Sequence, residues 1–305
     1  MTELMLDGAR LQGEVPETEW VGAMRETSVD TPIDEIRRRF AAEAYVCVPE
    51  FFSDQDVSGV RRAVFGHLAT AGEVQGDPEK GIYTGSSQRR QRIDDLGQFW
   101  REISEDWTLR RVSHSRALHE FCDILLGEPS IAHDFIFLRV SNYGRKTLVH
   151  NDHGFFTRST DNVITAWIAF GNIPLQMGPL FILENSHNHP RVQESIRNFD
   201  VARDTGRKAS WSETPLEAAR QLSCRVLTRH MRPGDLVVFS MKILHGSFDN
   251  VDPNQHIRLT CDVRYQPRSE SRDPRYFGPD PGGTTGQGYG ELVGAIPLDE
   301  AWHIR

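Results

Sequence analysis

Two residues near the middle of the chain have the types and spacing of metal ligands. His150 and Asp152 lie two positions apart, and in an extended segment side chains with that spacing point to the same face. An imidazole and a carboxylate side by side can occupy two adjacent corners of an octahedral metal site. The pair alone is a weak signal, because a surface histidine beside a solvated aspartate has the same spacing.

A third ligand is available farther along the chain. The turn at 233–235 leads into the apolar run 236–239, and His245 follows shortly after it. A histidine just after a buried strand would lie in the wall of a β-barrel, where it could complete a set of two histidines and one carboxylate. Such a set holds a metal on one face and leaves three positions open. The alternative is a core histidine that only packs there.

The predicted strand after His245 carries an unusual polar face. Arg258, Thr260, Asp262 and Arg264 alternate along it and share one face. The opposite face is apolar: Leu259, Cys261 and Val263. A buried guanidinium needs a partner, because an unpaired internal charge is costly. A dicarboxylate fits, since one carboxylate can accept a bidentate pair from Arg258 while a keto-acid end chelates the metal.

Helical patterns dominate the first part of the chain. Thr31 is predicted to cap a first helix, and Ser53 a second one with apolar residues at helical spacing. Gly127 is predicted to end a third helix, over about residues 116–126. Between the first two helices, the β-prone run 45–48 is expected to form a short strand.

After residue 130 the pattern changes to short β-prone runs separated by turn residues, which is typical of a sandwich or barrel. These runs are 136–140, 163–168, 180–183, 236–239 and 257–265. Helices followed by strands predict an α+β fold, mainly β, with helices packed outside a jelly roll.

The expected organisation is one domain over 31–305, preceded by a loose N-terminal arm over 1–30. The jelly-roll core would span about residues 130–266. It would be interrupted by a polar insertion over 191–230, read as loop with a helical patch near 215–222, and followed by a Gly/Pro-rich loop over 267–290. We expect these two loops, with loop 70–106, to shape a binding mouth.

The composition is that of a soluble globular protein, with 38% hydrophobic and 26% charged residues in 305. A net charge of −8 argues against nucleic-acid binding, and no apolar run approaches the roughly 18 residues of a membrane span. The N-terminal segment lacks a secretory pattern. The cysteines are scattered without a CxxC pair: Cys47, Cys122, Cys224 and Cys261. Reduced thiols and a cytoplasmic location are therefore expected.

Taken in order, the motifs resemble those of a known family. They are His150-Asn151-Asp152, the tryptophan strand 165–169, 177–180 followed by Asn185-Ser186-His187, Pro233-Gly234-Asp235, His245-Gly246-Ser247 and Arg258. With the opening segment 44–53, this set resembles the phytanoyl-CoA dioxygenase (PhyH) family of Fe(II)/2-oxoglutarate-dependent oxygenases, over roughly 34–68 and 130–266. The chain departs from the family pattern at Asn185, where a glycine is usual, and in a slightly long interval between His245 and Arg258.

The resemblance implies a double-stranded β-helix core (a cupin-like jelly roll) with flanking N-terminal helices. It implies Fe(II) bound by His150, Asp152 and His245, with O2 as oxidant and ascorbate as an optional reductant. It also implies 2-oxoglutarate contacts from four residues: Arg258, Ser247, Trp167 and Thr165. Arg264 is a rival anchor for the co-substrate, or else pairs with Asp262.

The function expected from this resemblance is hydroxylation of an unactivated C–H bond of a small-molecule metabolite, with release of succinate and CO2. The carboxylate of Asp152 favours this outcome, because relatives that halogenate have a small residue there. The same centre could instead catalyse desaturation, cyclisation or epimerisation. A non-catalytic jelly-roll binding protein is a further alternative. The motifs encode neither the substrate, free or carrier-bound, nor the oligomeric state.

Other residues of chemical interest receive structural interpretations. His187 and His189 are spaced like ligands but belong to a motif that is structural in the family. His153 could face either the substrate or solvent. The run Arg89, Arg90 and Arg92 is read as a solvated face, with contact to an anionic substrate as the alternative. The glycines over 286–290 are read as a flexible loop rather than a nucleotide-binding loop, since no strand precedes them.

Overall fold

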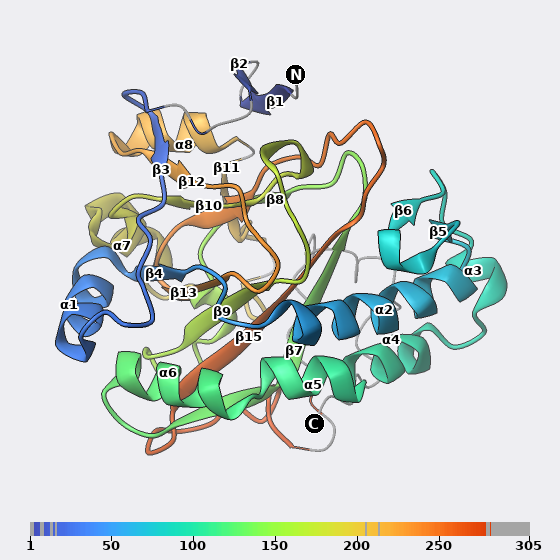
Figure 1. The fold of residues 1–305 in the computed structure, drawn as a ribbon. Coiled ribbons are helices and arrows are strands. Elements are labelled where there is room, and N and C mark those ends of the chain that lie inside the picture. Colours follow the sequence, from blue (N-terminus) through green and yellow to red (C-terminus); the bar gives the residue numbers. More distant parts are fainter. Residues whose placement is uncertain are drawn as a thin grey trace.

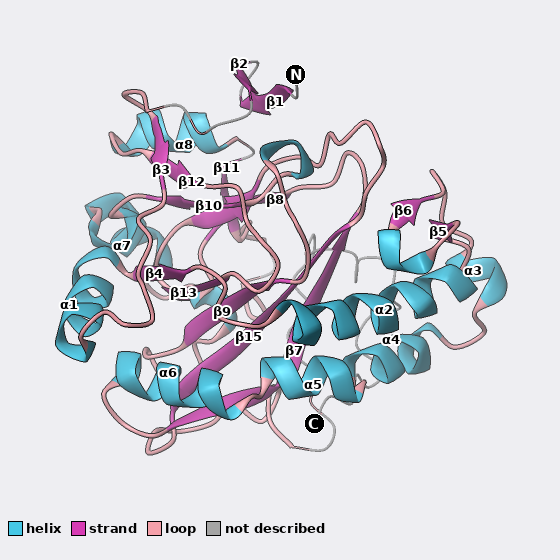
Figure 2. Cartoon of the chain, viewed as in Figure 1, coloured by secondary structure: helices cyan, strands magenta, loops and turns pink. Residues whose placement is uncertain are grey.

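Two β-sheets packed against each other form the centre of the molecule, and helices cover the outer side of the larger sheet (Figure 1). The computed structural model describes residues 3–6, 9–12, 15, 17–204, 206–212, 214–278 and 281. Figure 2 shows helices in front of the strands of the larger sheet, and further helices at the left and the top of the view. Among the described residues, no helix is both long and apolar enough to cross a membrane.

In the part of the chain that the structure describes, the larger sheet has five strands, and every neighbouring pair is antiparallel. Their order is β4 (Tyr45–Val48), β13 (Leu236–Ser240), β9 (Ile164–Ala169), β15 (Arg258–Pro267) and β7 (Ser130–Ser141). The smaller sheet has the order β11 (Ser210–Ser212), β8 (Thr147–His150), β14 (His245–Ser247), β10 (Leu180–Leu183), β12 (Val226–Thr228) and β3 (Val21–Ala23). Two facing sheets with this non-sequential strand order form the predicted jelly roll, which is thereby confirmed.

Among the described residues, six helices precede β7, and two lie within the insertion 191–230 or at its border. The first six are α1 (Ile33–Glu43), α2 (Asp54–Thr70), α3 (Arg89–Arg92), α4 (Leu96–Ser104), α5 (Trp107–Ser113) and α6 (Arg116–Leu126). The other two are α7 (Pro190–Ile196) and α8 (Pro215–Leu222). Two short hairpins are β1 (Glu3–Leu6) with β2 (Ala9–Gln12), and β5 (Val74–Gln75) with β6 (Ile82–Tyr83). Single 3-10 turns cover Pro78–Lys80, His153–Phe155, Leu175–Met177 and Ser186–Asn188.

Alternation along the strands divides the apolar residues into three clusters. On β9, Ile164 and Ile168 belong to the cluster that packs against helices such as α2, whereas Trp167 belongs to the cluster between the sheets. The third cluster lies on the outer side of the smaller sheet, under α8. Because side chains of a strand alternate between faces, the larger sheet turns one face to the helices and the other to the interior.

Local signals placed several elements correctly. The Ser53 hydroxyl accepts a hydrogen bond from the Asp56 backbone N–H at the start of α2. Gly127, with a φ of 78°, ends α6 in the left-handed conformation that glycine adopts without strain. The first helix begins slightly later than predicted, with Pro32 rather than Thr31 at the N-cap.

Three expectations about irregular segments are wrong in part. The expected loop 70–106 contains the β5–β6 hairpin and the helices α3 and α4. The arm 1–30 contributes β3, which pairs in parallel with β12 and extends the smaller sheet. The insertion 191–230, read as loop apart from its helical patch, contributes β11 and β12 to the same sheet, and the patch itself is α8. These strands have only three residues each, too few to show an alternating pattern in the sequence. The glycines over 286–290 lie outside the described residues.

Candidate metal centre

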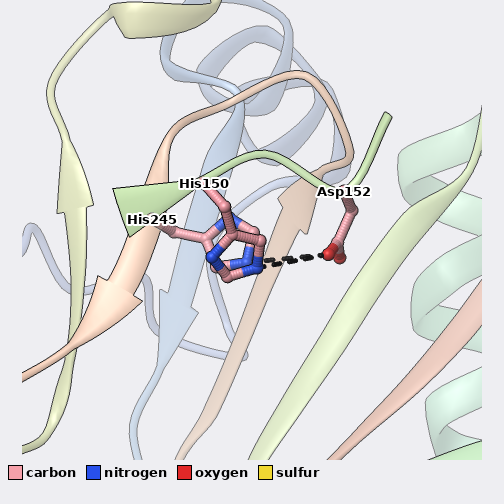
Figure 3. A group of neighbouring side chains, drawn as sticks. All are labelled: His150, Asp152 and His245. Carbon is pink, nitrogen blue, oxygen red and sulfur yellow. Dashed lines mark ion pairs between the residues drawn. The ribbon is translucent and has the colours of Figure 1, made fainter. Parts of the chain in front are cut away.

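Two neighbouring strands of the smaller sheet bring the predicted ligands together. His150 is the last residue of β8, and His245, the first residue of β14, pairs directly with it. Asp152 follows the end of β8, with φ −81° and ψ −12°, so it does not continue the extended segment as predicted. Its side chain still reaches the two histidines, as Figure 3 shows.

The three side chains present one ligand atom each to a common point. These atoms lie within 4.8 Å of one another, and all three residues are buried. Asp152 Oδ1 lies 3.6 Å from His150 Nε2 and 3.9 Å from His245 Nε2. Adjacent donors around a metal with bonds near 2.1 Å would be about 3 Å apart, so a slight inward movement suffices. Two imidazoles and one carboxylate fit a divalent transition metal such as Fe(II).

The other nitrogen of each imidazole is held by a backbone carbonyl two residues earlier. His150 Nδ1 lies 2.7 Å from the Leu148 oxygen, and His245 Nδ1 lies 3.1 Å from the Ile243 oxygen. A carbonyl can only accept, so each Nδ1 carries the proton and each Nε2 keeps its lone pair for a metal. Burial, together with neighbouring His150, lowers the pKa of His245 to about 3, so this imidazole is neutral near pH 7.

The carboxylate of Asp152 is oriented by two donors on its far oxygen. Thr165 Oγ1 donates to Oδ2 at 2.7 Å, and Arg264 Nη2 donates to the same oxygen at 3.0 Å. Burial alone would raise the pKa of Asp152, but the Arg264 guanidinium and the hydrogen bond with His150 hold it well below its usual value. Asp152 is therefore ionised, with Oδ1 directed at the histidines.

Arg258 lies between the sheets in a cradle of neutral acceptors. Its Nη2 lies 2.9 Å from both the Ser247 and the Ser141 hydroxyl oxygens. Its Nη1 donates to the Gly178 carbonyl and lies 3.4 Å from the carbonyls of Met177 and Phe248. Arg258 is 2% exposed. The predicted polar interior face of β15 is thus present. Strand β14 carries both His245 and Ser247, and Ser247 is a hydrogen-bond partner of Arg258.

Gly178, in the motif at 177–180, allows the backbone to pass close to Phe248 beside Arg258. A Cβ on Gly178, whose φ is +68°, would meet the Phe248 carbonyl oxygen at 2.1 Å. Asn185, which stands where the family has glycine, has a φ of 55°. Asparagine tolerates this left-handed conformation better than most residues, so the departure preserves the turn. The carboxylate of Asp235 accepts hydrogen bonds from the backbone N–H groups of Glu50 and Arg232, so the Pro233-Gly234-Asp235 motif has a structural role.

The other two residues predicted to contact 2-oxoglutarate, Trp167 and Thr165, do not lie in the same surroundings as each other. Trp167 is packed in the apolar cluster between the sheets, and Thr165 donates to Asp152. Arg264 pairs with Asp152 at 3.0 Å and only more distantly with Asp262, at 3.7 Å. Sequence reasoning missed Arg139 and Ser141 of β7, because that strand was predicted only over 136–140 and its polar residues were not connected with β15.

The remaining candidates lie outside the triad. His187 and His189 belong to a 3-10 turn and its cap, and neither joins the metal-binding group found among the described residues. His153 Nε2 lies 3.4 Å from an oxygen of Asp161. Arg89 is not part of a solvated face as predicted: it is buried and pairs with fully buried Glu73 at 2.6 Å.

Comparison with known proteins agrees with this geometry. The family model described as "Phytanoyl-CoA dioxygenase (PhyH)" matches residues 44–258, which include the triad and Arg258. Among curated protein sequences, none matches the chain significantly.

Solved structures of similar fold include a carbocyclase, an epimerase and EctD. The carbocyclase SnoK from nogalamycin biosynthesis has a TM-score of 0.54 and 19% identity, covering 82% of this chain and 90% of its own. The epimerase SnoN, in complex with Fe3+, alpha ketoglutarate and nogalamycin RO, has a TM-score of 0.52 and 18% identity, covering 90% of this chain and 95% of its own. EctD from S. alaskensis, with 2-oxoglutarate and 5-hydroxyectoine, has a TM-score of 0.51 and 15% identity, covering 90% of this chain and 92% of its own. These likenesses show the shared fold, and the match over 44–258 shows that the chain belongs to the phytanoyl-CoA dioxygenase family of Fe/2-oxoglutarate-dependent oxygenases.

Proposed function

We propose that the protein is an Fe(II)- and 2-oxoglutarate-dependent dioxygenase that hydroxylates an unactivated C–H bond of a small-molecule metabolite. One observation carries the proposal: the ligand atoms of His150, Asp152 and His245 converge at a buried point. A neutral His245 and an ionised Asp152 are the protonation states that metal binding requires.

The protein's own contribution begins with a fixed set of ligands. His150, Asp152 and His245 would hold the iron on one face, so that three positions stay open for co-substrate and O2. When bound, the iron would couple oxidative decarboxylation of 2-oxoglutarate to succinate and CO2 with transfer of the other oxygen atom of O2 into the substrate C–H bond. Burial of all three ligands would keep bulk water from the centre.

Arg258 would bind the carboxylate of 2-oxoglutarate that is remote from the metal. Its guanidinium is buried, and an ionised acceptor makes a stronger hydrogen bond than the neutral carbonyls and hydroxyls around it. Ser247 would support this contact, since its hydroxyl lies 2.9 Å from Arg258 Nη2. Trp167 would offer an apolar wall between the sheets, whereas Thr165 would act through Asp152.

Product analysis tests the proposed reaction. Purified protein with Fe(II), ascorbate, 2-oxoglutarate and 18O2 would be incubated with a library of small metabolites, with His245→Ala as the inactive control. Hydroxylation predicts succinate together with a product that gains one labelled oxygen atom. A product that loses two hydrogens would instead indicate desaturation or ring closure, and an isomer of unchanged mass would indicate epimerisation. Succinate that never exceeds the His245→Ala level, with any library member, would contradict the oxygenase function.

A further inference from the structure

A row of alternating charges runs behind the metal ligands. Arg139 Nε lies 2.6 Å from Asp262 Oδ2, and the same oxygen lies 3.7 Å from Arg264 Nη2. Arg264 Nη2 in turn lies 3.0 Å from Asp152 Oδ2. The side chains of all four residues are at most 9% exposed. Two positive and two negative groups thus alternate inside the jelly roll and end on the metal-binding carboxylate.

We propose that Arg264 is a positioning residue that holds Asp152 so that only one of its carboxylate oxygens binds the metal. Asp262 and Arg139 in turn hold Arg264 in place. The proposal rests on the metal-binding role of the triad in the proposed function. It gives Arg264 a task distinct from that of Arg258, six residues earlier on the same face of β15.

The geometry of Asp152 supports this role. Oδ2 receives two hydrogen bonds, from Arg264 and Thr165, whereas Oδ1 faces the Nε2 atoms of both histidines. Turning the carboxylate to offer both oxygens to a metal would break both bonds. The rotation is therefore fixed before a metal arrives, which reduces the conformational entropy lost on binding.

The position of Arg264 is itself fixed from two directions. Its guanidinium carbon lies 4.5 Å from the ring centre of Phe137 and 5.4 Å from that of Phe156. These aromatic contacts define where the planar guanidinium lies. Asp262 balances its charge, with Oδ2 3.7 Å from the same Nη2 that binds Asp152. Asp262 remains in place because Arg139 binds it across the β7–β15 pair.

Two effects of Arg264 on metal affinity oppose each other. A positive charge near a divalent cation weakens binding by repulsion, whereas a fixed carboxylate strengthens it. The repulsion is small because Asp262 and Asp152 neutralise the two arginines. Loss of partners that orient a ligand costs about 10- to 100-fold in metal affinity. We therefore expect the orienting effect of Arg264 on Asp152 to exceed its repulsion of the metal, so that removing Arg264 weakens metal binding.

The test measures metal binding rather than turnover. Arg264→Met keeps most of the side-chain volume but removes the charge and the donors. Wild type and variant would be titrated anaerobically with Co(II) alone, following affinity and the visible absorption of bound Co(II). We expect affinity to fall at least about 10-fold, with an altered absorption spectrum, because the carboxylate is free to bind through both oxygens.

A matched control separates this role from general stability. Arg229 has 11% side-chain exposure and pairs with buried Asp235 at 3.2 Å, away from the triad. Arg229→Met should lower the stability but leave Co(II) affinity and spectrum unchanged. If the Arg264→Met protein does not fold, Arg264→Lys and Thr165→Val provide milder perturbations of the same oxygen, and either should change the spectrum.

The outcomes separate the two proposals. A folded Arg264→Met protein, or either milder variant, with wild-type Co(II) affinity and spectrum would overturn the positioning role while the metal centre stands. Wild type that binds no Co(II), Fe(II) or Mn(II) would instead overturn the proposed function on which this inference rests.

Discussion

His150 and His245 lie directly opposite each other on the antiparallel strands β8 and β14, with their ring centres 4.2 Å apart. This pairing is the most direct link between the fold and the chemistry. It places two side chains that are distant in sequence on one face of the smaller sheet, and the loop after β8 adds Asp152. The proposed metal site therefore depends on the spacing between two strands, and we expect a change in that spacing to change the metal affinity.

Gly246 controls that spacing. A Cβ there would meet the Phe181 ring at 2.6 Å and the backbone oxygens of Thr147 and Leu148 at 2.7 and 3.0 Å. The Leu148 oxygen is the one that orients His150. Gly246→Ala should therefore destabilise the fold by about 1–3 kcal/mol and weaken Co(II) binding, measured by urea unfolding and metal titration.

Gly66→Ala is the matched control, because the added Cβ on α2 would meet no described atom within 4 Å apart from its chain neighbours and the backbone of its own helix. It should stabilise the protein by up to about 1 kcal/mol and leave metal binding unchanged. Equal metal affinity in the Gly246→Ala and Gly66→Ala proteins would contradict the importance of the β8–β14 spacing.

Arg258→Met should affect the co-substrate more than the metal. In the proposed complex the guanidinium would give 2-oxoglutarate charged hydrogen bonds worth about 1.5–3 kcal/mol each, so we expect 2-oxoglutarate to bind at least about 10-fold more weakly to the metal-loaded variant. Arg258 is not a member of the ligand group formed by His150, Asp152 and His245, so we expect nearly unchanged Co(II) affinity without 2-oxoglutarate. Calorimetric titration with 2-oxoglutarate measures the effect, and an unchanged dissociation constant would assign the co-substrate carboxylate to another residue.

Much of the site could be predicted because its chemistry follows local patterns. The triad and the polar face of β15 are visible as residue types at fixed spacing, and Ser53 and Gly127 mark helix ends directly. The partners of Asp152 were harder to foresee. Whether Arg264 meets Asp152 or its neighbour Asp262 depends on how the loop after β8 crosses the sheet, which spacing along β15 does not determine.

Buried polar pairs in the helical region illustrate the same limit. Arg89 belongs to a basic run that indicates exposure, yet it binds Glu73, which has 0% exposure. Its guanidinium also lies 4.5 Å from the Trp100 ring. A run of basic residues does not indicate which acidic residue elsewhere in the chain will lie beside it. Only the folded chain therefore shows that Arg89 is buried against Glu73.

Removing Arg89 should therefore be costly. Arg89→Met leaves the Glu73 carboxylate buried without its cation, and we expect a loss of about 3–5 kcal/mol in unfolding free energy. The exposed pair Arg62 and Glu79, at 65% and 57% side-chain exposure, provides the comparison, and Arg62→Met should cost about 0–1 kcal/mol. Denaturant unfolding measures both, and equal costs would show that Glu73 finds another partner.

Stability should fall in mild acid because of buried histidines. Burial, with nearby positive charge, lowers the pKa of His133 and of His114 from 6.5 to about 3. Below pH 6.5 these two histidines become protonated in the unfolded chain but stay neutral in the folded chain. Their contribution to the free energy of unfolding is therefore fully present above pH 6.5 and decreases between pH 6.5 and 3. Each histidine contributes up to about 1.4 kcal/mol per pH unit.

Urea unfolding of metal-free protein at pH 7.5 and 5.5 measures this dependence. His133→Gln should reduce the difference in unfolding free energy between the two pH values, since one group that titrates in this window is removed. An unchanged or larger difference in the variant would mean that His133 is not the neutral buried group described.

The proposed function requires that His150, Asp152 and His245 form an iron site to which 2-oxoglutarate binds. The most direct measurement is an anaerobic titration of the protein with Fe(II) and 2-oxoglutarate, following the weak visible charge-transfer band of the chelate, beside His245→Ala. We predict a band that saturates with both components in wild type and is absent in the variant. Folded wild-type protein that shows no band at saturating Fe(II) and 2-oxoglutarate would contradict the proposed iron site.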